Sequence, residues 1–229
     1  NARFYADELA TRVPALDYRA ALSLEEAIAL AGDAEVLVAL APFITPALVA
    51  AMPRLAWIQT LTTGVDNVIG LSDAALTNLT GFHGPQMSEL AVLLMLACGR
   101  RFLEILENQK AHHWERRPQP LLQDKTACIV GLGVIAEHLA KVLGAFGMTV
   151  TGVSGGRTEA PGIARVYPRS VLADAAAEAD FLILLTPYTP ETHHIVDARV
   201  LAAMKPTAFL INIARGGCAD EAAVASALT

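Results

Sequence analysis

Residues 125–157 read KTACIVGLGVIAEHLAKVLGAFGMTVTGVSGGR, and the rest of the chain can be interpreted outward from them. Two short apolar runs typical of β-strands, residues 126–130 and 149–153, enclose a glycine turn and an amphipathic segment that stops at Gly147. The order of strand, tight turn, helix and strand is the unit that holds a dinucleotide in doubly wound sheets. This stretch therefore predicts a dinucleotide-binding α/β domain.

Each small residue of the turn has a separate reason to be small. Gly131 can adopt the backbone angles of a tight turn, Gly133 lets a pyrophosphate approach the main chain, and Ala136 lets helix and strand pack closely. The phosphates would then meet the N–H groups near Val134 and Ile135, which have no partner inside the helix. A glycine turn between any two packed elements is the alternative, and the lengths of the flanking strands and helix favour the dinucleotide interpretation.

Composition excludes several classes of protein. The 229 residues are 54% hydrophobic and 17% charged, and the formal net charge of −6 comes without a basic stripe, which argues against nucleic acid as a partner. The longest apolar run, residues 90–98, is far shorter than the roughly 20 residues of a membrane helix, so we expect a buried helix and no membrane partner. Cys98, Cys128 and Cys218 lack metal-binding spacing and predict reduced core residues of a cytoplasmic protein, with no metal site.

The first part of the chain alternates strands and helices, which predicts a parallel, doubly wound sheet. A capping box formed by Ser23 and Glu26 opens one helix, and Thr45 followed by Pro46 opens another. Such a sheet usually begins with a strand, so we expect its first strand to be missing from this chain. The predicted helices cover residues 2–12, 23–31 and 46–52, and the predicted strands cover residues 17–21, 35–40 and 55–61.

A long helix is expected over residues 85–114, followed by a linker at Pro118 and Pro120. His112 and His113 at its end point about 100° apart on a helix, so they are interpreted as surface or interface residues rather than metal ligands. The chain is thus divided into a first domain (1–84), a connecting helix and linker (85–117), and the dinucleotide-binding domain (118–229).

In the last third, two strands end in polar loops. Residues 181–185 run into Thr186 and Pro187, and residues 209–213 run into a loop that contains Arg215. Helices are expected over residues 170–179 and after the capping residues Asp197 and Asp220. The predicted fold class is α/β, with two doubly wound parallel-sheet domains, one flavodoxin-like and one Rossmann, both incomplete. The second would contain four of the six strands expected of a Rossmann domain.

Five segments in this order, TTGVDN, HGPQMSE, GLGVIA, LLTPYTPETHHIV and MKPTAFLINIARGGCADEAAV, resemble the D-isomer-specific 2-hydroxyacid dehydrogenases, glyoxylate and hydroxypyruvate reductases among them. The resemblance implies a substrate domain followed by an NAD(P)-binding domain, with the active site between them. It further implies hydride transfer between NAD(P)H and a small 2-oxo acid or D-2-hydroxy acid, and a homodimer.

The resemblance also assigns roles to individual residues. Arg215 matches the catalytic arginine, and a structural arginine paired with Asp220 is the alternative. The family's proton donor is a histidine paired with a glutamate, and both follow the arginine; no histidine follows Arg215, so we expect the 229 residues not to turn over substrate alone. Substrate-binding positions are Thr63, Gly64 and Val65, for which residues alone also allow an ordinary turn, and further cofactor-binding positions are Thr186, Pro187, Ile213 and Ala214.

The end of the second strand predicts which dinucleotide is preferred. NAD-specific sites place an acidic residue there to accept the ribose 2′-OH, whereas this chain has Ser154, followed three residues later by Arg157. A hydroxyl and a guanidinium suit a 2′-phosphate, so we expect a preference for NADP, with NAD possible. An exposed arginine in a flexible loop is the alternative for Arg157. The rival functions are an NAD-dependent phosphoglycerate-type dehydrogenase and a non-catalytic dinucleotide-binding regulator of the same fold.

Overall fold

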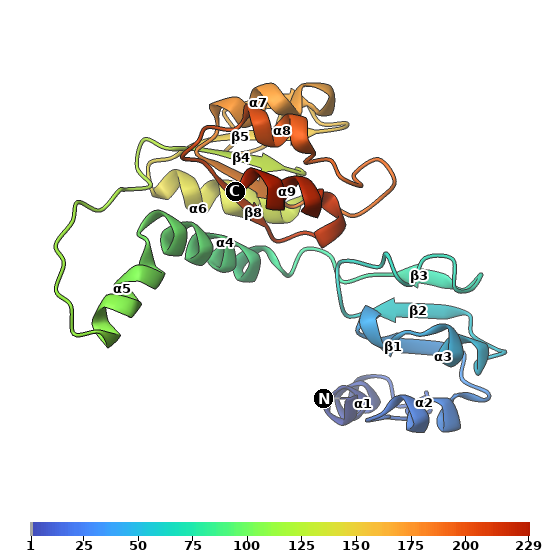
Figure 1. The fold of residues 1–229 in the computed structure, drawn as a ribbon. Coiled ribbons are helices and arrows are strands. Elements are labelled where there is room, and N and C mark those ends of the chain that lie inside the picture. The colour runs from blue at the N-terminus through green and yellow to red at the C-terminus, as the bar shows by residue number, and fades with distance from the viewer. Residues whose placement is uncertain (1) are drawn as a thin grey trace. The chain divides into compact units, whose positions relative to one another are not determined.

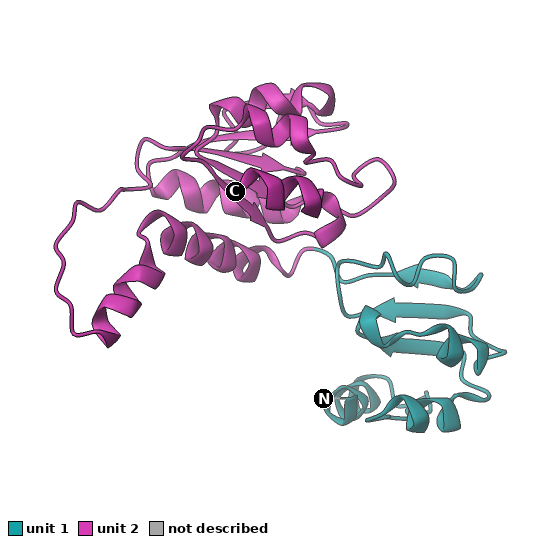
Figure 2. Ribbon diagram, in the orientation of Figure 1, with its two compact units in different colours: residues 1–80 teal, residues 81–229 magenta. Residues whose placement is uncertain are grey.

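The protein, described here as a computed structural model over residues 2–229, is an α/β chain with two parallel sheets. It divides into two compact units after Thr80, shown in teal and magenta in Figure 2, and each is described by itself. The α/β class with two parallel-sheet units is confirmed. The domain boundaries at 84/85 and 117/118 stay predictions, although helix α4 (Gly84–Gly99) packs against α6 (Val134–Ala145) inside the second unit.

The first unit is built on a three-stranded parallel sheet in the order β1-β2-β3. Because the strands are parallel, their carboxyl ends, and the loops that follow them, lie at one edge of the sheet. Ile58 of β2 and Ile44, Val49 and Val68 from the surrounding loops and helix form the buried core. The elements of this unit are α1 (Ala2–Arg12), α2 (Leu24–Ala31), β1 (Val36–Ala39), η1 (Ala41–Phe43), α3 (Pro46–Ala50), β2 (Trp57–Thr60) and β3 (Ala75–Thr77).

Two sequence expectations for the first unit are wrong. Residues 17–21 form no strand. The guanidinium of Arg19 donates to Asp17 within this segment and to Asp33 and the Leu30 carbonyl outside it, and these bonds hold the segment away from the sheet. Strand β3 was not predicted, since its three residues lie in a polar stretch and none is buried. The capping box is half formed: Ser23 Oγ accepts from the Glu26 N–H, whereas the Glu26 carboxylate accepts from the N–H of the preceding Leu22.

The second unit is built on a five-stranded parallel sheet in the order β6-β5-β4-β7-β8. Along β4, Ala127 and Ile129 face α4 and α6, while Cys128 and Val130 face α7 and α8, so the strand is buried on both faces. Figure 1 shows these two helical layers on either side of the sheet. The strands are β4 (Thr126–Val130), β5 (Thr149–Ser154), β6 (Arg165–Pro168), β7 (Phe181–Leu184) and β8 (Phe209–Asn212).

The strand order places a topological switch point at the carboxyl ends of the central strands. From β4 the chain proceeds outward through β5 and β6, then returns to the other side of β4 for β7 and β8. Connections therefore leave β4 and β7 in opposite directions, and the carboxyl ends of adjacent strands at such a switch point form the usual ligand crevice of doubly wound sheets. The sequence predicted four strands here, and the fifth, β6, was missed.

The long helix expected over residues 85–114 is instead two helices. Helix α4 ends at Gly99, and α5 (Phe102–Lys110) begins after Arg101, whose φ of 52° lies in the left-handed region and breaks the helical path. Only one face of α4 is buried: Met95 is fully buried, while Leu93 and Cys98 are exposed. The expectation of a buried helix therefore holds for one face of α4 only, and the expectation of a core Cys98 is wrong.

The remaining elements of the second unit largely follow the sequence expectations. Asp197 and Asp220 cap α8 and α9 as predicted, and Thr45 caps α3 in the first unit. The helix predicted from residue 170 begins with a 3-10 turn. These elements are η2 (Arg169–Val171), α7 (Leu172–Glu178), α8 (Ala198–Ala203), η3 (Gly216–Cys218) and α9 (Glu221–Ala227).

Asp180 ties three segments together at the amino-terminal edge of this sheet, and we expect its charge to stabilise the fold. Its carboxylate accepts from the Thr126 N–H at 2.8 Å and from Lys205 Nζ at 3.2 Å. Burial alone would raise the pKa of Asp180, but these two interactions outweigh it and hold the pKa below its ordinary value of 3.8. The stabilisation is therefore present above that pH and is lost as pH falls through the folded-state pKa.

Replacing Asp180 with Asn should lower the free energy of unfolding by about 1–2 kcal/mol at pH 7, because two charge-assisted hydrogen bonds are weakened. Urea unfolding between pH 7 and pH 3 measures this, and the difference between the variant and the unmodified chain should shrink below about pH 4. Asp174→Asn on α7 is a matched control, since no hydrogen bond of its carboxylate is seen in the described chain. A deficit that is constant over the whole pH range would contradict this account.

Candidate functional site

The glycine turn after β4 is held between the ends of two other strands. Gly131 donates its N–H to the Val153 carbonyl at 2.9 Å, and its φ of 100° lies in the left-handed region. A Cβ at this position would come within 2.6 Å of the Thr186 backbone nitrogen. Only glycine satisfies both conditions, and this close contact brings together Gly131 and Thr186, two of the predicted cofactor-binding positions.

The second glycine leaves open space in front of a helix. Gly133 precedes α6, a Cβ built on it meets nothing within 4 Å, and no side chain caps the helix. The first N–H groups of α6, those of Val134 and Ile135 among them, have no acceptor within the helix and carry the positive end of its dipole. Ala136 is buried, so the helix packs closely on the sheet. The free N–H groups at its start can hold an anion against the main chain, and this edge therefore fits a pyrophosphate.

The loop after β5 is ordered by its own side chains. Ser154 Oγ accepts from the N–H groups of Gly156 (3.3 Å) and Arg157 (3.0 Å), which leaves the hydroxyl proton available to donate. Arg157 Nη1 donates to the Leu132 carbonyl at 3.0 Å and to Glu137 Oε1 at 2.6 Å. The sequence did not indicate a role for Glu137, because no local motif signals that a residue in the first turn of α6 contacts a residue twenty positions later.

Arg215 lies in the loop after β8, and a neighbouring amide shapes that loop. The Asn212 side chain donates to the Arg215 carbonyl at 2.8 Å and accepts from the Ala214 N–H at 3.0 Å. Arg215 is exposed, and its Nη1 donates to the Ala214 carbonyl. Asp220, the partner in the alternative interpretation, accepts from two N–H groups at the start of α9. Asn212 was missed, since its two bonds form only when the chain turns back on itself.

Two loops at the carboxyl edge are in contact. Thr186 is buried and Pro187 is exposed, and the chain then folds back so that Thr192 Oγ1 donates to the Pro187 carbonyl at 2.6 Å. A Cβ added to Gly217, two residues after Arg215, would lie 2.6 Å from the Tyr188 ring. The loops after β7 and β8 are therefore packed together. Ile213 and Ala214, half-buried, lie at the start of the second of these loops.

The predicted substrate loop lies in the first unit, at the carboxyl end of β2. Thr63 Oγ1 donates to the Leu79 carbonyl at 2.9 Å, and Asn78 Nδ2 donates to the Thr63 carbonyl at 2.7 Å. Thr62 Oγ1 donates to the Gly64 carbonyl at 3.0 Å. These bonds occupy side chains and carbonyls and hold the loop that carries Thr63, Gly64 and Val65. The structure thus groups these three residues in one unit and the predicted cofactor residues with Arg215 in the other.

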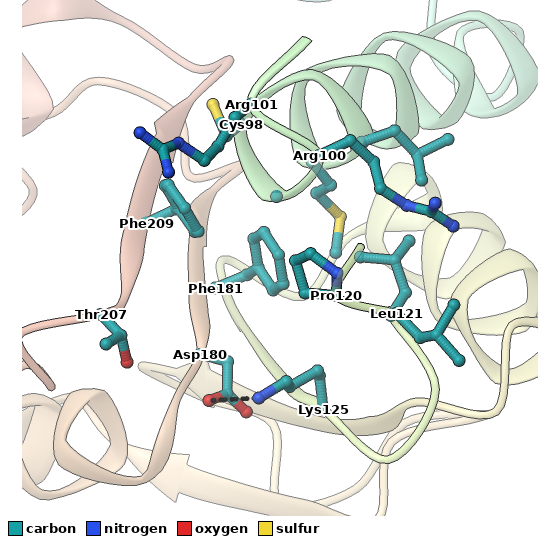
Figure 3. Close-up of a pocket in the computed structure, with 14 residues that line it drawn as sticks. Cys98, Arg100, Arg101, Pro120, Leu121, Lys125, Asp180, Phe181, Thr207 and Phe209 are labelled. Carbon is teal, nitrogen blue, oxygen red and sulfur yellow. Dashed lines mark ion pairs between the residues drawn. The ribbon is translucent and has the colours of Figure 1, made fainter. Parts of the chain in front are cut away.

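A cavity of about 250 Å³ lies at the opposite, amino-terminal edge of the five-stranded sheet. Figure 3 shows the stacked rings of Phe181 and Phe209, 5.4 Å apart, with the Lys125–Asp180 ion pair below them. Its lining comes from the end of α4, from residues 120–125 and from the starts of β7 and β8, and it contains none of the predicted site residues.

Among residues 2–229, no three His, Cys, Asp or Glu side chains lie close enough together to hold a metal ion. None of the helices described is long and apolar enough to cross a membrane.

The amino-acid sequence is similar to those of known proteins. Residues 92–229 match the family model described as D-isomer specific 2-hydroxyacid dehydrogenase, NAD binding domain. A glyoxylate reductase of Thermococcus onnurineus is 31% identical over 78% of this chain and 57% of its own length. A D-3-phosphoglycerate dehydrogenase of Synechocystis is 31% identical over 96% of this chain and 41% of its own. The chain thus spans about half the length of these curated relatives.

Solved structures of similar proteins superpose on this chain. A D-isomer specific 2-hydroxyacid dehydrogenase family protein of Aeromonas salmonicida superposes with a TM-score of 0.90 at 34% identity, over 100% of this chain and 74% of that one. The structure of an NADPH-dependent glyoxylate/hydroxypyruvate reductase of Sinorhizobium meliloti in complex with NADP and sulfate superposes with a TM-score of 0.75 at 28% identity, over 85% of this chain and 63% of that one.

The fold, its switch point and the glycine turn define a dinucleotide-binding α/β protein. With the family match over more than half of the chain, the particular group is also clear. The chain belongs to the D-isomer specific 2-hydroxyacid dehydrogenase family, as its sequence motifs indicated.

The two turn glycines should differ in what their replacement damages. Gly131→Ala forces a Cβ against the Thr186 backbone in a left-handed conformation, so we expect the free energy of unfolding to fall by at least about 2 kcal/mol. Gly133→Ala places its Cβ in open space, so stability should change by less than about 1 kcal/mol. Because that methyl group would occupy the space expected for the pyrophosphate, Gly133→Ala should instead weaken dinucleotide binding at least tenfold.

Urea unfolding and fluorescence titration with NADPH measure the two effects. Gly144→Ala is the matched control, because Gly144 is on α6 and a Cβ built on it also meets nothing within 4 Å. This substitution should neither lower stability nor weaken NADPH binding. Unchanged NADPH affinity in a folded Gly133→Ala chain would contradict the assignment of Gly133 to the pyrophosphate.

Proposed function

We propose that this chain binds NADPH in preference to NADH, and that the protein reduces a small 2-oxo acid, glyoxylate or hydroxypyruvate, to the 2-hydroxy acid. The observation that carries the proposal is the end of β5, where Ser154 and Arg157 stand in place of an acidic residue. A carboxylate there would repel a 2′-phosphate, whereas a hydroxyl proton and a guanidinium favour it. The NADP complex of the Sinorhizobium reductase supports the same preference.

Different residues of the chain bind different parts of the cofactor in this proposal. Gly131, Gly133 and the N–H groups of Val134 and Ile135 hold the pyrophosphate, Ser154 and Arg157 meet the adenosine ribose, and the loops after β7 and β8 line the nicotinamide end. The bound nicotinamide supplies a hydride to the carbonyl carbon of the substrate. The cofactor-lining positions of these two loops are Thr186, Pro187, Ile213 and Ala214.

Arg215 is the catalytic residue of the proposal. A guanidinium can bind the substrate carboxylate with two parallel hydrogen bonds and polarise the adjacent carbonyl, which stabilises the alkoxide charge that develops on oxygen during reduction. Asn212 fixes the turn that presents Arg215. The backbone amides of Thr63, Gly64 and Val65 are proposed to bind the carboxylate from the substrate domain.

An NAD-dependent phosphoglycerate-type dehydrogenase is the second candidate function. Its support is the similarity to the Synechocystis D-3-phosphoglycerate dehydrogenase, which extends over 96% of this chain. The two candidates differ in the dinucleotide, so cofactor preference separates them.

Parallel fluorescence titrations with NADPH and NADH test the proposed function on this chain, and we expect NADPH to bind at least tenfold more tightly. Ser154→Asp should reverse the order, because its carboxylate would repel the 2′-phosphate and accept the ribose hydroxyl of NADH. Gln123→Glu at the opposite edge of the sheet adds the same charge as a control. Equal or tighter binding of NADH by the unmodified chain would reject NADP preference and favour the phosphoglycerate-type alternative.

A cytoplasmic homodimer completes the proposal. The three cysteines are free, as expected in a reducing compartment. Exposed apolar side chains lie along α4 and α5, as expected of a surface that binds another protein chain. Leu93 is 62% exposed, Leu103 is 73% exposed, and Ile105 is 41% exposed.

If this surface joins two copies, light scattering should give twice the mass of one chain, and Leu93→Glu should convert the dimer to a monomer. Leu16→Glu, at an exposed leucine of the first unit, is the control. A monomer for the unmodified chain would refute the dimer.

A further inference from the structure

Arg169 lies beside the loop that follows β5, although fifteen residues separate it from Ser154 in sequence. Strand β6 pairs with β5 in a register that sets Pro168 opposite Ser154, so Arg169, the next residue, is at the same carboxyl edge. Its guanidinium covers Gly155: a Cβ built on Gly155 would lie 2.8 Å from Arg169 Nη2 and 3.1 Å from Cζ. The absence of a side chain at position 155 is what allows this close approach.

The two arginines of this edge differ in how their charges are used. Arg157 is matched by Glu137 at 2.6 Å and is fixed on the Leu132 carbonyl, so the Arg157–Glu137 pair has no net charge. In the chain from residue 2 to 229, Arg169 forms no ion pair and its guanidinium donates no hydrogen bond, and it is only half-exposed. Arg169 acts electrostatically on Glu191. A hydrogen bond from Thr189 is the main cause that lowers the pKa of Glu191, and Arg169 adds a smaller effect.

We propose that Arg169 is a second specificity-determining residue, which pairs with the 2′-phosphate of NADPH across Gly155, together with Ser154 and Arg157. This inference rests on the proposed function and names the residue that gives the adenosine edge its positive charge. A 2′-phosphate carries nearly two negative charges and three acceptor oxygens. Arg157, already balanced by Glu137, leaves most of that charge unmatched, and the planar guanidinium of Arg169 supplies the missing donors.

The structure also explains how Arg169 would discriminate between the two dinucleotides. NADH has a neutral hydroxyl where NADPH has the phosphate, so loss of the Arg169 cation removes little from NADH binding. A residue that merely supported the loop would affect both dinucleotides to a similar extent. The ratio of the two affinities, rather than either one alone, therefore reports the role of Arg169.

The test uses Arg169→Met, which keeps much of the apolar stem, and measures binding of NADPH, NADH and adenosine 2′,5′-bisphosphate to the chain. We expect NADPH and the bisphosphate to bind about 10- to 100-fold more weakly, the range of a charge-assisted hydrogen bond pair, and NADH to change less than twofold. Arg165→Met is the matched control: this arginine begins β6, the strand that leads to Arg169, its guanidinium lies 4.3 Å from the Tyr167 ring, and its loss should leave all three affinities unchanged.

A second variant keeps Arg169 but moves it. Gly155→Ala would push the guanidinium from its place over the loop, so it should weaken NADPH binding in the same direction and leave NADH binding nearly unchanged. Retained NADH binding in either variant also shows that the domain remains folded.

The outcomes distinguish this inference from the function on which it rests. If the unmodified chain prefers NADPH but Arg169→Met binds it normally, the inference fails and the preference for NADPH stands. If the unmodified chain binds NADH as tightly as NADPH, the proposed function itself fails. Equal weakening of both dinucleotides by Arg169→Met would show a structural role and would also overturn the inference.

Discussion

The close passage of the Gly131 backbone against Thr186 fixes the geometry of the whole carboxyl edge of the second unit. A Cβ at Gly131 would lie 2.6 Å from the Thr186 nitrogen, so the chain can turn from β4 into α6 here only without a side chain. This contact holds the ends of the adjacent strands β4 and β7 together at the switch point. It also aims the first turn of α6 along the crevice, with open space in front of Gly133 where an anion can lie.

The sequence predicted the central elements well because their patterns are strong. Strands β4 and β7 are buried on both faces and read as continuous apolar runs, which is typical of the middle of a parallel sheet. Strands β3 and β6 are edge strands: β3 has no buried residue, β6 buries only Tyr167 and ends in a proline, so their apolar signal is weak. Conversely, residues 17–21 have an alternating pattern, but the bonds of Arg19 to Asp17 and Asp33 determine their path.

The candidate site was predictable where backbone conformation demands a particular residue. Glycines 131 and 133 and the helix caps Asp197 and Asp220 have local causes, which a single sequence reveals. Side chains that act on distant segments leave no such trace. Glu137 and Arg169 reach the loop after β5 only once the sheet has formed, since the packing of α6 and the register of β6 on β5 decide their neighbours.

The Glu137–Arg157 pair shows why the adenosine edge depends on more than the residue at the end of β5. Both side chains are more than a third exposed, so the pair adds little to stability, and its main effect is to hold Arg157 against the Leu132 carbonyl at the glycine turn. An acid so close to the proposed phosphate position would weaken anion binding if it were not neutralised. Arg157 thus removes a repulsion as well as offering an attraction. The positive charge that the proposed 2′-phosphate would require must then come from a further cation, and the register of β6 places Arg169 beside this loop.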